Sequence, residues 1–499
     1  MKILLTSFYD LGKQPKIIAE IADKYSTSHV EFDCIDFSVD TPDLSLDEYD
    51  ALGIYAPMHT ATVLSIEYLR NKKLPDKVFT FGLYGSVLED FNSSIKHINN
   101  IEDGELDSFL GINKNLEFSL KNNIPNRSIF PDISNYAHLV DGRNNLIAGS
   151  VETTYGCKHS CTHCPIPITF NGSFKTFSIE KIVNDVSNQV DSGAQHISFN
   201  DPDFLNGPVH ALKVLEALNS KFPSITYDAT IKVEHIIKYQ KYFMQLSSLN
   251  MIFVISAFET TNDEVLTLLD KKHTNEDLSI AIELSQKANI DIRPTWMPFS
   301  PLANLDDLPN IIKLIESYKL RETVDPIQLT IKLLVPKHSL ILDETAIKKY
   351  IGEYDKNSLS YKWAYKYKEV EKLQQLLFEY LSNNSDLDDH HQYLGMVKII
   401  EEFSDTKLLS TSEYNFKNVP KLSETWFCCS EPSKIQLDRI KSNLETNKIK
   451  YSIRSTKMKI PKDHRFYIVD SFGELGLFFK LSHISVVGGS LNNSGGHNP

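Results

Sequence analysis

The chain has few cysteines, fewer basic than acidic residues and no long apolar run. Six cysteines in 499 residues are too sparse and too unevenly spaced for a disulfide framework. Lys and Arg number 52 against 65 Asp and Glu, a formal net charge of −13, which argues against a protein that coats nucleic acid. No apolar run reaches the roughly 18 residues that a transmembrane helix needs, and the start MKILLTSFYD lacks the features of a signal peptide. We therefore expect a cytoplasmic protein without a transmembrane segment or a nucleic-acid partner.

The length corresponds to roughly three domains at about 150 residues each. Residues 1–90 alternate short apolar runs such as KILLTSFY and VEFDCIDF with helical segments such as KIIAEIADKY. This alternation predicts a flavodoxin-like parallel α/β domain. Residues 91–148 are less regular, and we expect them to form a connector.

From residue 149 to 340 the alternation resumes with longer units, which predicts a partial (βα) barrel with its active site at the carboxyl ends of the strands. The run PIQLTIKLLV at residues 326–335 is expected to be one of its strands. Residues 341–432 look mainly helical and end in the motif CCSEP. A boundary follows, because residues 433–499 hold 11 basic and 5 acidic side chains, whereas the preceding residues hold 41 and 60.

Three cysteines stand close together in one segment. Cys157, Cys161 and Cys164 have the spacing C-x3-C-x2-C, which suits an iron–sulfur cluster in which one iron lacks a protein ligand. Such an open iron can chelate a cofactor and pass an electron to it. The alternatives are a structural zinc site with His159 or His163 as the fourth ligand, or buried thiols without a metal.

The segment GCKHSCTHCP resembles the signature of the radical SAM superfamily. HISFNDPDF at 196–204 and AFET at 257–260 are similar to that superfamily's second-strand motif and its fourth-strand glutamate region. The resemblance implies that Cys157, Cys161 and Cys164 hold a [4Fe–4S] cluster and that S-adenosylmethionine (SAM) chelates the open iron. One electron then cleaves a C–S bond of SAM, usually giving a 5′-deoxyadenosyl radical. It also implies a small-molecule substrate and an electron donor such as flavodoxin or ferredoxin.

Acidic side chains at strand ends suit the ammonium group and the ribose hydroxyls of SAM. Asp201, Asp203 and Glu259 are therefore the expected cofactor-binding residues. Glu259 follows a buried apolar strand, where a carboxylate needs a partner, whereas either aspartate could instead shape a turn or cap a helix. Four further residues are weaker candidates for a substrate pocket: Lys232, Glu234, His235 and Arg293.

Many radical SAM enzymes carry a cobalamin-binding domain before the barrel, and residues 1–90 have a suitable topology. The usual D-x-H-x-x-G motif is missing, because FYDLG follows the first strand and contains no histidine. Cobalamin is thus not supported, although binding without a lower histidine ligand stays open. We expect His59 to be a loop or interface residue.

The tail motif SETWFCCSEP resembles a narrower radical SAM group named for its CUAEP or CCAEP tail. Cys428 and Cys429 are therefore expected to act in catalysis, as a thiol relay or as chelators of a soft element, and Ser430 replaces the alanine of the motif. The alternative is a pair of buried small side chains beside Trp426 and Phe427. A thiophilic substrate is the corresponding hypothesis.

Residues 433–499 resemble a different family, the Kdo (3-deoxy-D-manno-octulosonic acid) transferases, which are GT-B glycosyltransferases of lipopolysaccharide biosynthesis. The resemblance lies in VVGGSLNNSGGHNP, whose glycine-rich loops would bind the donor phosphate. The family continues beyond this point, and its acceptor-binding domain is replaced here by the radical SAM portion. A Kdo transferase is therefore the alternative function, and we expect the fragment to be inactive. The expected fold class is α/β throughout.

Overall fold

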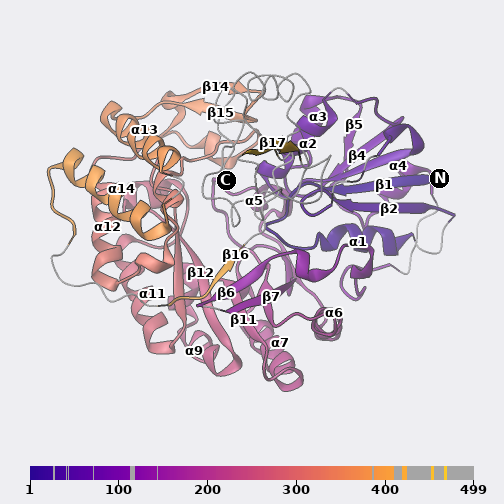
Figure 1. Ribbon diagram of the computed structural model, residues 1–499, viewed down its shortest axis with the longest axis horizontal. Helices are drawn as coiled ribbons and strands as arrows, with labels where there is room; N and C mark the ends of the chain where they lie inside the picture. The colour runs from indigo at the N-terminus through magenta and orange to yellow at the C-terminus, as the bar shows by residue number, and fades with distance from the viewer. Residues whose placement is uncertain are drawn as a thin grey trace.

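Two large sheets organise the part of the chain that can be described. The computed structural model describes residues 1–423 with short gaps (26–28, 41, 43, 71, 113–117, 143, 385–386 and 410–417), and beyond them only the backbone of 451–453 and 466–468. The first sheet lies on the right in Figure 1, and the second sheet lies below the centre.

The first sheet has five parallel strands in the order β2-β1-β3-β4-β5. Its strands are β1 (Lys2–Ser7), β2 (Glu31–Asp36), β3 (Ala51–Tyr55), β4 (Lys77–Phe81) and β5 (Ile95–His97), and its helices are α1 (Lys16–Lys24), α2 (His59–Leu69), α3 (Val87–Phe91) and α4 (Glu105–Leu110). The parallel α/β arrangement predicted for residues 1–90 is present, and the sheet continues past residue 90 to β5. The strand order reverses at β1, so the crevice where such sheets bind ligands lies at the carboxyl ends of β1 and β3.

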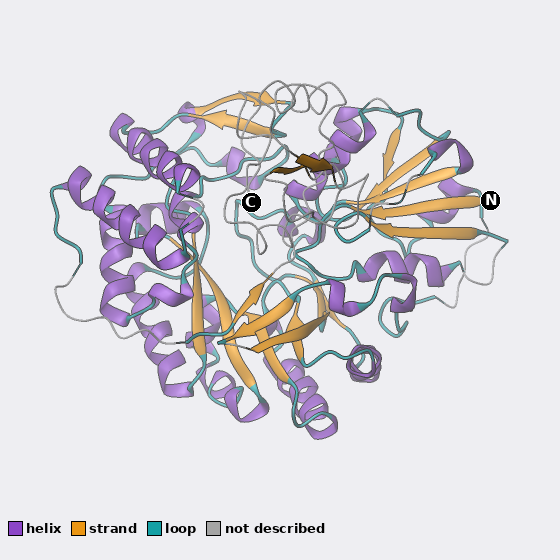
Figure 2. Cartoon of the chain, viewed as in Figure 1, coloured by secondary structure: helices purple, strands orange, loops and turns teal. Residues whose placement is uncertain are grey.

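The second sheet has seven strands in the order β13-β12-β11-β10-β7-β6-β16 and is curled (Figure 2). Its parallel strands are β7 (Asn144–Val151), β10 (His196–Phe199), β11 (Thr226–Thr230), β12 (Met251–Glu259) and β13 (Asp291–Trp296). β6 (His138–Asp141) runs antiparallel to its two neighbours, β7 and the edge strand β16 (Lys421–Ser423). The curled, mostly parallel sheet agrees with the α/β fold predicted from the sequence.

Helices follow the parallel strands and cover the outer face of the curled sheet (Figure 1). They are α6 (Ile179–Asp191), α7 (Pro208–Lys221), α8 (Val233–Lys238), α9 (Gln240–Phe243), α10 (Asp263–Leu268), α11 (Asn275–Ala288) and α12 (Asp307–Tyr318). α6 begins where the sequence provides a cap, because the side chain of Ser178 accepts a hydrogen bond from the amide of Lys181. The strands are buried, which explains runs such as MIFVISAFE in β12.

The strand predicted at residues 326–335 is wrong. The structure has a 3-10 helix over Pro326–Thr330, followed by a single parallel bridge between Phe299 and Lys332. Proline lacks the backbone donor that a central strand needs. The hydroxyl of Thr330 also donates to the carbonyl of Ile327 at 2.8 Å, which favours the helical turn.

The second sheet and the helices that cover it are called the barrel below. After the barrel, the chain forms a hairpin and two long helices. These are β14 (Ile351–Asp355), β15 (Ser360–Trp363), α13 (Lys368–Asn383) and α14 (Asp389–Ser404). The two helices agree with the expectation for residues 341–432, whereas the hairpin was not predicted. Leu359 in the hairpin turn packs into the hydrophobic cluster of the first sheet, so this region contacts both sheets.

Two predicted features lie outside the described residues. They are the CCSEP motif at 428–432 and most of residues 433–499, of which only β17 (Tyr451–Ile453) and β18 (Phe466–Ile468) are assigned, as a parallel pair.

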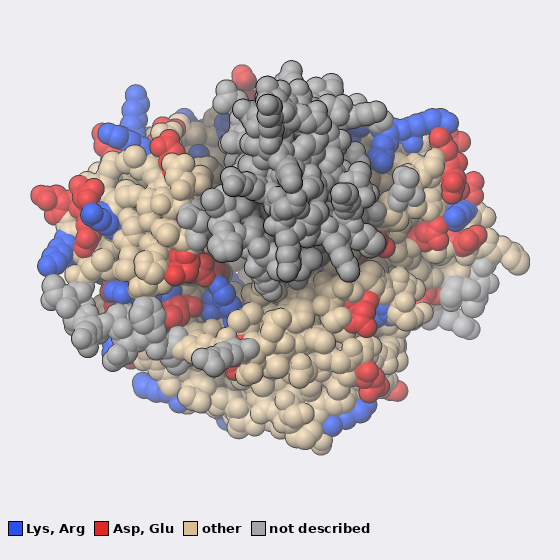
Figure 3. Space-filling view, in the orientation of Figure 1, with Lys and Arg blue, Asp and Glu red and all other residues tan. Residues whose placement is uncertain are grey.

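The surface carries acidic and basic side chains that are mixed with one another. On the face in Figure 3 these side chains lie mostly along the outer rim, while the surface below the centre has few charges. Within the stretches that the structure describes, no helix combines the length and the apolar character that crossing a bilayer would require.

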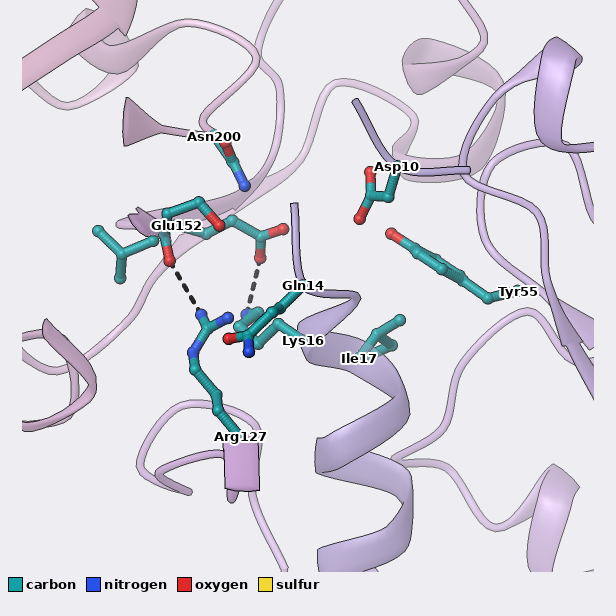
Figure 4. A pocket seen from close by; sticks show the side chains of 10 residues that line it. Asp10, Gln14, Lys16, Ile17, Tyr55, Arg127, Glu152 and Asn200 are labelled. Carbon is teal, nitrogen blue, oxygen red and sulfur yellow. Dashed lines mark hydrogen bonds and ion pairs between the residues drawn. The ribbon is translucent and has the colours of Figure 1, made fainter. Parts of the chain in front are cut away.

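Buried ion pairs join the first sheet to the barrel. Lys16 of α1 lies 2.8 Å from Glu152, which follows β7 (Figure 4), and 3.4 Å from Glu20. Lys181 of α6 reaches the same Glu20 at 2.6 Å, and both of these side chains are at most 3% exposed. Buried charges are stable only when they are paired, so this network fixes how α1 sits on the barrel.

Replacing the shared carboxylate should therefore destabilise the protein. Glu20→Gln leaves Lys16 and Lys181 buried with one partner fewer, and we expect a loss of about 3 kcal/mol in urea unfolding. The control is Asp47→Asn, which removes the partner of the exposed Lys73 and should cost less than about 1 kcal/mol. Equal losses in the two variants would contradict this interpretation.

Candidate functional site

The cysteine segment begins at a glycine whose position excludes other side chains. Gly156 ends β8 (Thr154–Gly156), which pairs with β9 (Phe174–Thr176). Its φ is +88°, and a Cβ atom there would lie 2.4 Å from the carbonyl oxygen of Ser173. Only glycine lets the chain pass this close to β9 and turn into Cys157.

Three free thiols follow this turn. Cys157 and Cys161 are buried and Cys164 is partly buried, and none of the three forms a disulfide. Burial raises the pKa of the Cys164 thiol to about 12 and also raises the pKa of Cys157. Such thiols are protonated at neutral pH unless a metal replaces the proton. This donor set therefore suits a thiolate-bound metal group.

Carboxylates engage both histidines that lie between the cysteines. His159 Nε2 is 3.1 Å from Asp203, and His163 Nε2 is 3.4 Å from Glu259. These contacts direct each Nε2 at a carboxylate, whereas a Cys3His zinc site needs an imidazole nitrogen bound together with the three thiolates. Among the described residues, three thiols without a fourth ligand in the same loop fit an iron–sulfur cluster with an open iron better than they fit zinc.

Thr162 fastens the cysteine loop to the barrel. Its hydroxyl donates to the carbonyl of Leu268 at 2.8 Å, and its amide donates to the carbonyl of Leu269 at 3.2 Å. Its own carbonyl accepts a hydrogen bond from the amide of Ile341 at 2.9 Å. The loop is thus held both by the end of α10 and by the segment after the barrel.

Two buried side chains direct N–H groups at the sulfur atoms. Lys232 Nζ lies 3.6 Å from Cys161 Sγ, and Asn206 Nδ2 lies 3.5 Å from Cys157 Sγ. Donors that face thiolates stabilise their negative charge and tune the reduction potential of a bound cluster. These two residues therefore belong to the immediate surroundings of the thiols.

Asp201 connects the carboxyl ends of β7 and β10. Its carboxylate accepts hydrogen bonds from the amide of Thr153 at 2.9 Å, from the hydroxyl of Thr153 at 2.8 Å and from the hydroxyl of Thr154. Burial raises the pKa of Asp201 to about 6, against the lowering effect of these hydrogen bonds. Asp201 thus holds the strand that leads into the cysteine loop.

Asp203 lies between two histidines from separate parts of the chain. His159 Nε2 is 3.1 Å and His235 Nδ1 is 2.5 Å from the same oxygen, Oδ2. Burial alone would raise the pKa of Asp203, but the hydrogen bond from His159 and the proximity of His235 lower it to about 2. Sequence reasoning missed this grouping, because only the fold brings α8 next to the cysteine loop.

Glu259 is the last residue of β12, and its backbone has the unusual φ of +64°. Its side chain lies beside one lysine and one histidine. Lys271 Nζ is 2.8 Å and His163 Nε2 is 3.4 Å from its Oε1 atom. Burial acts to raise the pKa of Glu259, but the charge of Lys271 outweighs it and holds this pKa well below its usual range. The expected need for a partner is met by Lys271, which the sequence alone did not indicate.

The weaker candidates separate into two groups. Glu234 and His235 join the site, and Glu234 Oε2 lies 3.6 Å from His159 Nδ1. Arg293 instead donates to the carbonyl of Pro420 at 3.3 Å, so it contacts the edge strand β16 rather than the cysteine loop.

Two other predictions concern residues away from this loop. His59 Nε2 lies 2.7 Å from the carbonyl oxygen of Ser358 in the hairpin turn, which agrees with the loop or interface role expected for it. Cys428 and Cys429 lie outside the described residues, so their catalytic role stays a prediction.

Comparison with known proteins gives this arrangement a family context. Residues 151–315 match the family model for the radical SAM superfamily. A curated relative from Clostridium botulinum, ribosomal protein uS12 methylthiotransferase RimO, is 22% identical over 277 residues, covering 52% of this chain and 60% of the relative. The protein of the same name from Pseudothermotoga lettingae is 29% identical over 186 residues, covering 35% and 43%. The chain thus spans about half the length of these relatives.

Solved structures show a similar fold. The cobalamin-dependent SAM radical enzyme OxsB, with aqua-cobalamin bound, matches with a TM-score of 0.60 at 13% identity, covering 81% of this chain and 71% of OxsB. The radical SAM methyltransferase TsrM from Kitasatospora setae, with tryptophan and a SAM analogue bound, matches with a TM-score of 0.50 at 12% identity, covering 64% and 71%. The chain therefore contains a radical SAM superfamily domain, and the cysteine loop lies within the matched residues.

Gly156, just before the cysteine loop, allows a test of whether the tight turn into this loop is needed for metal uptake. Gly156→Ala should prevent most of the iron uptake during anaerobic reconstitution, because the new Cβ would collide with the backbone at Ser173. Gly172→Ala is the matched control, since Gly172 also has a positive φ (+70°) but its nearest atom would be 3.9 Å from a Cβ. Iron per chain is the measurement, and equal iron in the two variants would show that the loop tolerates the side chain.

Proposed function

We propose that this protein is a radical SAM enzyme that binds a [4Fe–4S] cluster through Cys157, Cys161 and Cys164. The observation that carries the proposal is the set of three free thiols in one anchored loop, inside the residues that match the radical SAM superfamily. The two histidines between the cysteines are engaged by carboxylates, which leaves three thiols and no fourth ligand in this loop among the residues that the structure describes. When bound, such a cluster supplies the electron that cleaves a C–S bond of SAM.

The surrounding residues would prepare the site for this cofactor. Glu259 stays ionised beside Lys271 and can face the ammonium group or a ribose hydroxyl of SAM. Asp201 and Asp203 share this region and are the other proposed contacts, although both already have protein partners. The buried walls around the thiols would keep water away from reactive species.

The substrate remains a small molecule of undetermined identity in this proposal, and an electron donor such as flavodoxin or ferredoxin would reduce the cluster. The relatives named above are methylthiotransferases of a ribosomal protein, but they match only part of this chain. Membership of the CUAEP or CCAEP-tail group would make Cys428 and Cys429 a catalytic pair acting on a thiophilic substrate. Thiol-dependent metalloid binding that disappears in Cys428→Ala is the test of that hypothesis.

The alternative function, Kdo transfer by residues 433–499, receives no support from the family match or from the relatives and structures described above. The matched family and the cysteine loop both lie in the other part of the chain. We therefore propose no glycosyltransferase function for this protein.

Cobalamin is not part of this proposal, although the similar enzyme OxsB binds it. Near the carboxyl ends of β1 and β3, Lys16 pairs with Glu152 of the barrel (Figure 4). The cavity that remains between Asp10, Tyr55 and Asn200 has a volume of about 10 Å³, which holds about one water molecule. The argument against cobalamin therefore rests on the sequence, in which FYDLG follows the first strand without a histidine.

The proposal predicts about four irons per chain after anaerobic reconstitution and cleavage of SAM after reduction with dithionite. Cys164→Ser should lose at least half of the iron and the cleavage activity, because one cluster ligand is removed. Cys34→Ser is the control, since Cys34 is a free cysteine in β2 of the first sheet, and it should keep both properties. Mass spectrometry of the SAM fragments identifies the broken bond, and intact SAM with a fully loaded wild-type protein would refute the proposal.

A further inference from the structure

A second group of metal-ligating side chains lies beside the cysteine loop. Among the described residues, His159, Asp203 and His235 offer one ligand atom each, and these atoms lie within 4.8 Å of one another. His159 belongs to the cysteine loop, Asp203 follows β10, and His235 lies on α8. Asp203 and His235 are buried, and His159 is largely buried.

Both imidazoles converge on one carboxylate oxygen. Asp203 Oδ2 is 3.1 Å from His159 Nε2 and 2.5 Å from His235 Nδ1. His235 Nδ1 is buried, and the carboxylate of Asp203 is its partner in this ion pair. In a tetrahedral site with bonds of about 2.1 Å, ligand atoms are about 3.4 Å apart. Small side-chain movements would therefore open a position for an ion that partners all three atoms.

The backbone orients Asp203 for such a role. Its other oxygen, Oδ1, accepts hydrogen bonds from the amide of Leu205 at 3.3 Å and from the amide of Lys232 at 3.4 Å. These bonds leave Oδ2 to face the imidazoles. Hydrogen bonds of this kind hold ligating carboxylates in place in metal sites.

Glu234 lies where its carboxylate can accept a hydrogen bond from the ring of His159. Its Oε2 atom is buried without a hydrogen-bond partner and lies 3.6 Å from His159 Nδ1. An ion on Nε2 of His159 would place the ring proton on Nδ1, which faces Glu234. Histidine ligands usually donate this proton to a carboxylate or a carbonyl.

We propose that His159, Asp203 and His235 form a mononuclear site for a divalent transition-metal ion of the Zn²⁺ class, next to the thiol site and distinct from it. Two histidines and one carboxylate form a donor set of catalytic zinc and non-haem iron sites, and they leave coordination positions open for an external ligand. Asp203 then binds the ion, which replaces its proposed contact with SAM, and Asp201 and Glu259 remain the proposed carboxylates for SAM.

Co²⁺ is the probe for this site, in a full-length variant whose Cys157, Cys161 and Cys164 are replaced by serine. We expect one Co²⁺ per chain, with visible d–d absorption and no thiolate charge-transfer band. On the same background, His235→Ala should weaken Co²⁺ binding at least a hundredfold. Glu234→Gln should weaken it about tenfold, as removal of a supporting carboxylate does.

The matched control is His391→Ala. His391 also lies beside an aspartate, Asp388, at 2.8 Å, but both side chains are exposed, so the titration should not change. The proposal is wrong if Co²⁺ does not bind stoichiometrically or if His235→Ala binds it as tightly as its parent.

A second measurement does not depend on how the cysteine-free variant folds. Wild-type protein reconstituted with iron and zinc should contain one zinc per chain, and His235→Ala should lose the zinc and keep the iron. Loss of both metals in His235→Ala would mean that His235 supports the cysteine loop instead, which overturns the proposal. Zinc without iron in the wild type would refute the proposed cluster, and it would uphold this site only if His235→Ala lost that zinc.

Discussion

The fixed position of the cysteine loop is the constraint on which the rest of the site depends. Thr162 uses its hydroxyl, its amide and its carbonyl to join this loop to α10 and to the segment after the barrel. Gly156 provides the tight turn before the loop, at a point where a side chain has no room. A metal group with three thiol ligands needs this rigidity, because a loop that moved would change the separation of the sulfur atoms.

Charge compensation explains why so many ionisable groups can be buried around the loop. Each buried carboxylate has a polar partner: Asp201 has two threonines, Asp203 has two histidines and Glu259 has Lys271. Lys232 adds a positive group near a cysteine sulfur. Buried charges without such partners would cost several kcal/mol each. The same pairing keeps Asp203 and Glu259 ionised and able to attract cations or cationic groups.

The sequence predicted those parts of the molecule that depend on local patterns. The alternation of apolar runs indicated two parallel α/β units, and the spacing of Cys157, Cys161 and Cys164 indicated a radical SAM segment, which lies within the matched family residues. The partners of the acidic residues could not be predicted, because His235 lies on α8 and Lys271 follows α10, and only the tertiary fold brings them to these carboxylates. Local sequence also misled at Pro326, where β-branched and apolar residues indicated a strand but the missing backbone donor favours a 3-10 helix.

The first sheet has a structural role in this account. Its helix α1 is tied to the barrel through Lys16 and Glu152 and to α6 through Glu20 and Lys181, and the hairpin turn at Leu359 packs into its core. It thereby supports the barrel whose loop carries the thiols. Electron paramagnetic resonance of the reconstituted, reduced protein tests the central claim most directly. The account predicts the spectrum of one reduced [4Fe–4S] cluster per chain that changes when SAM is added, and a spectrum without such a cluster, or one that SAM leaves unchanged, would contradict it.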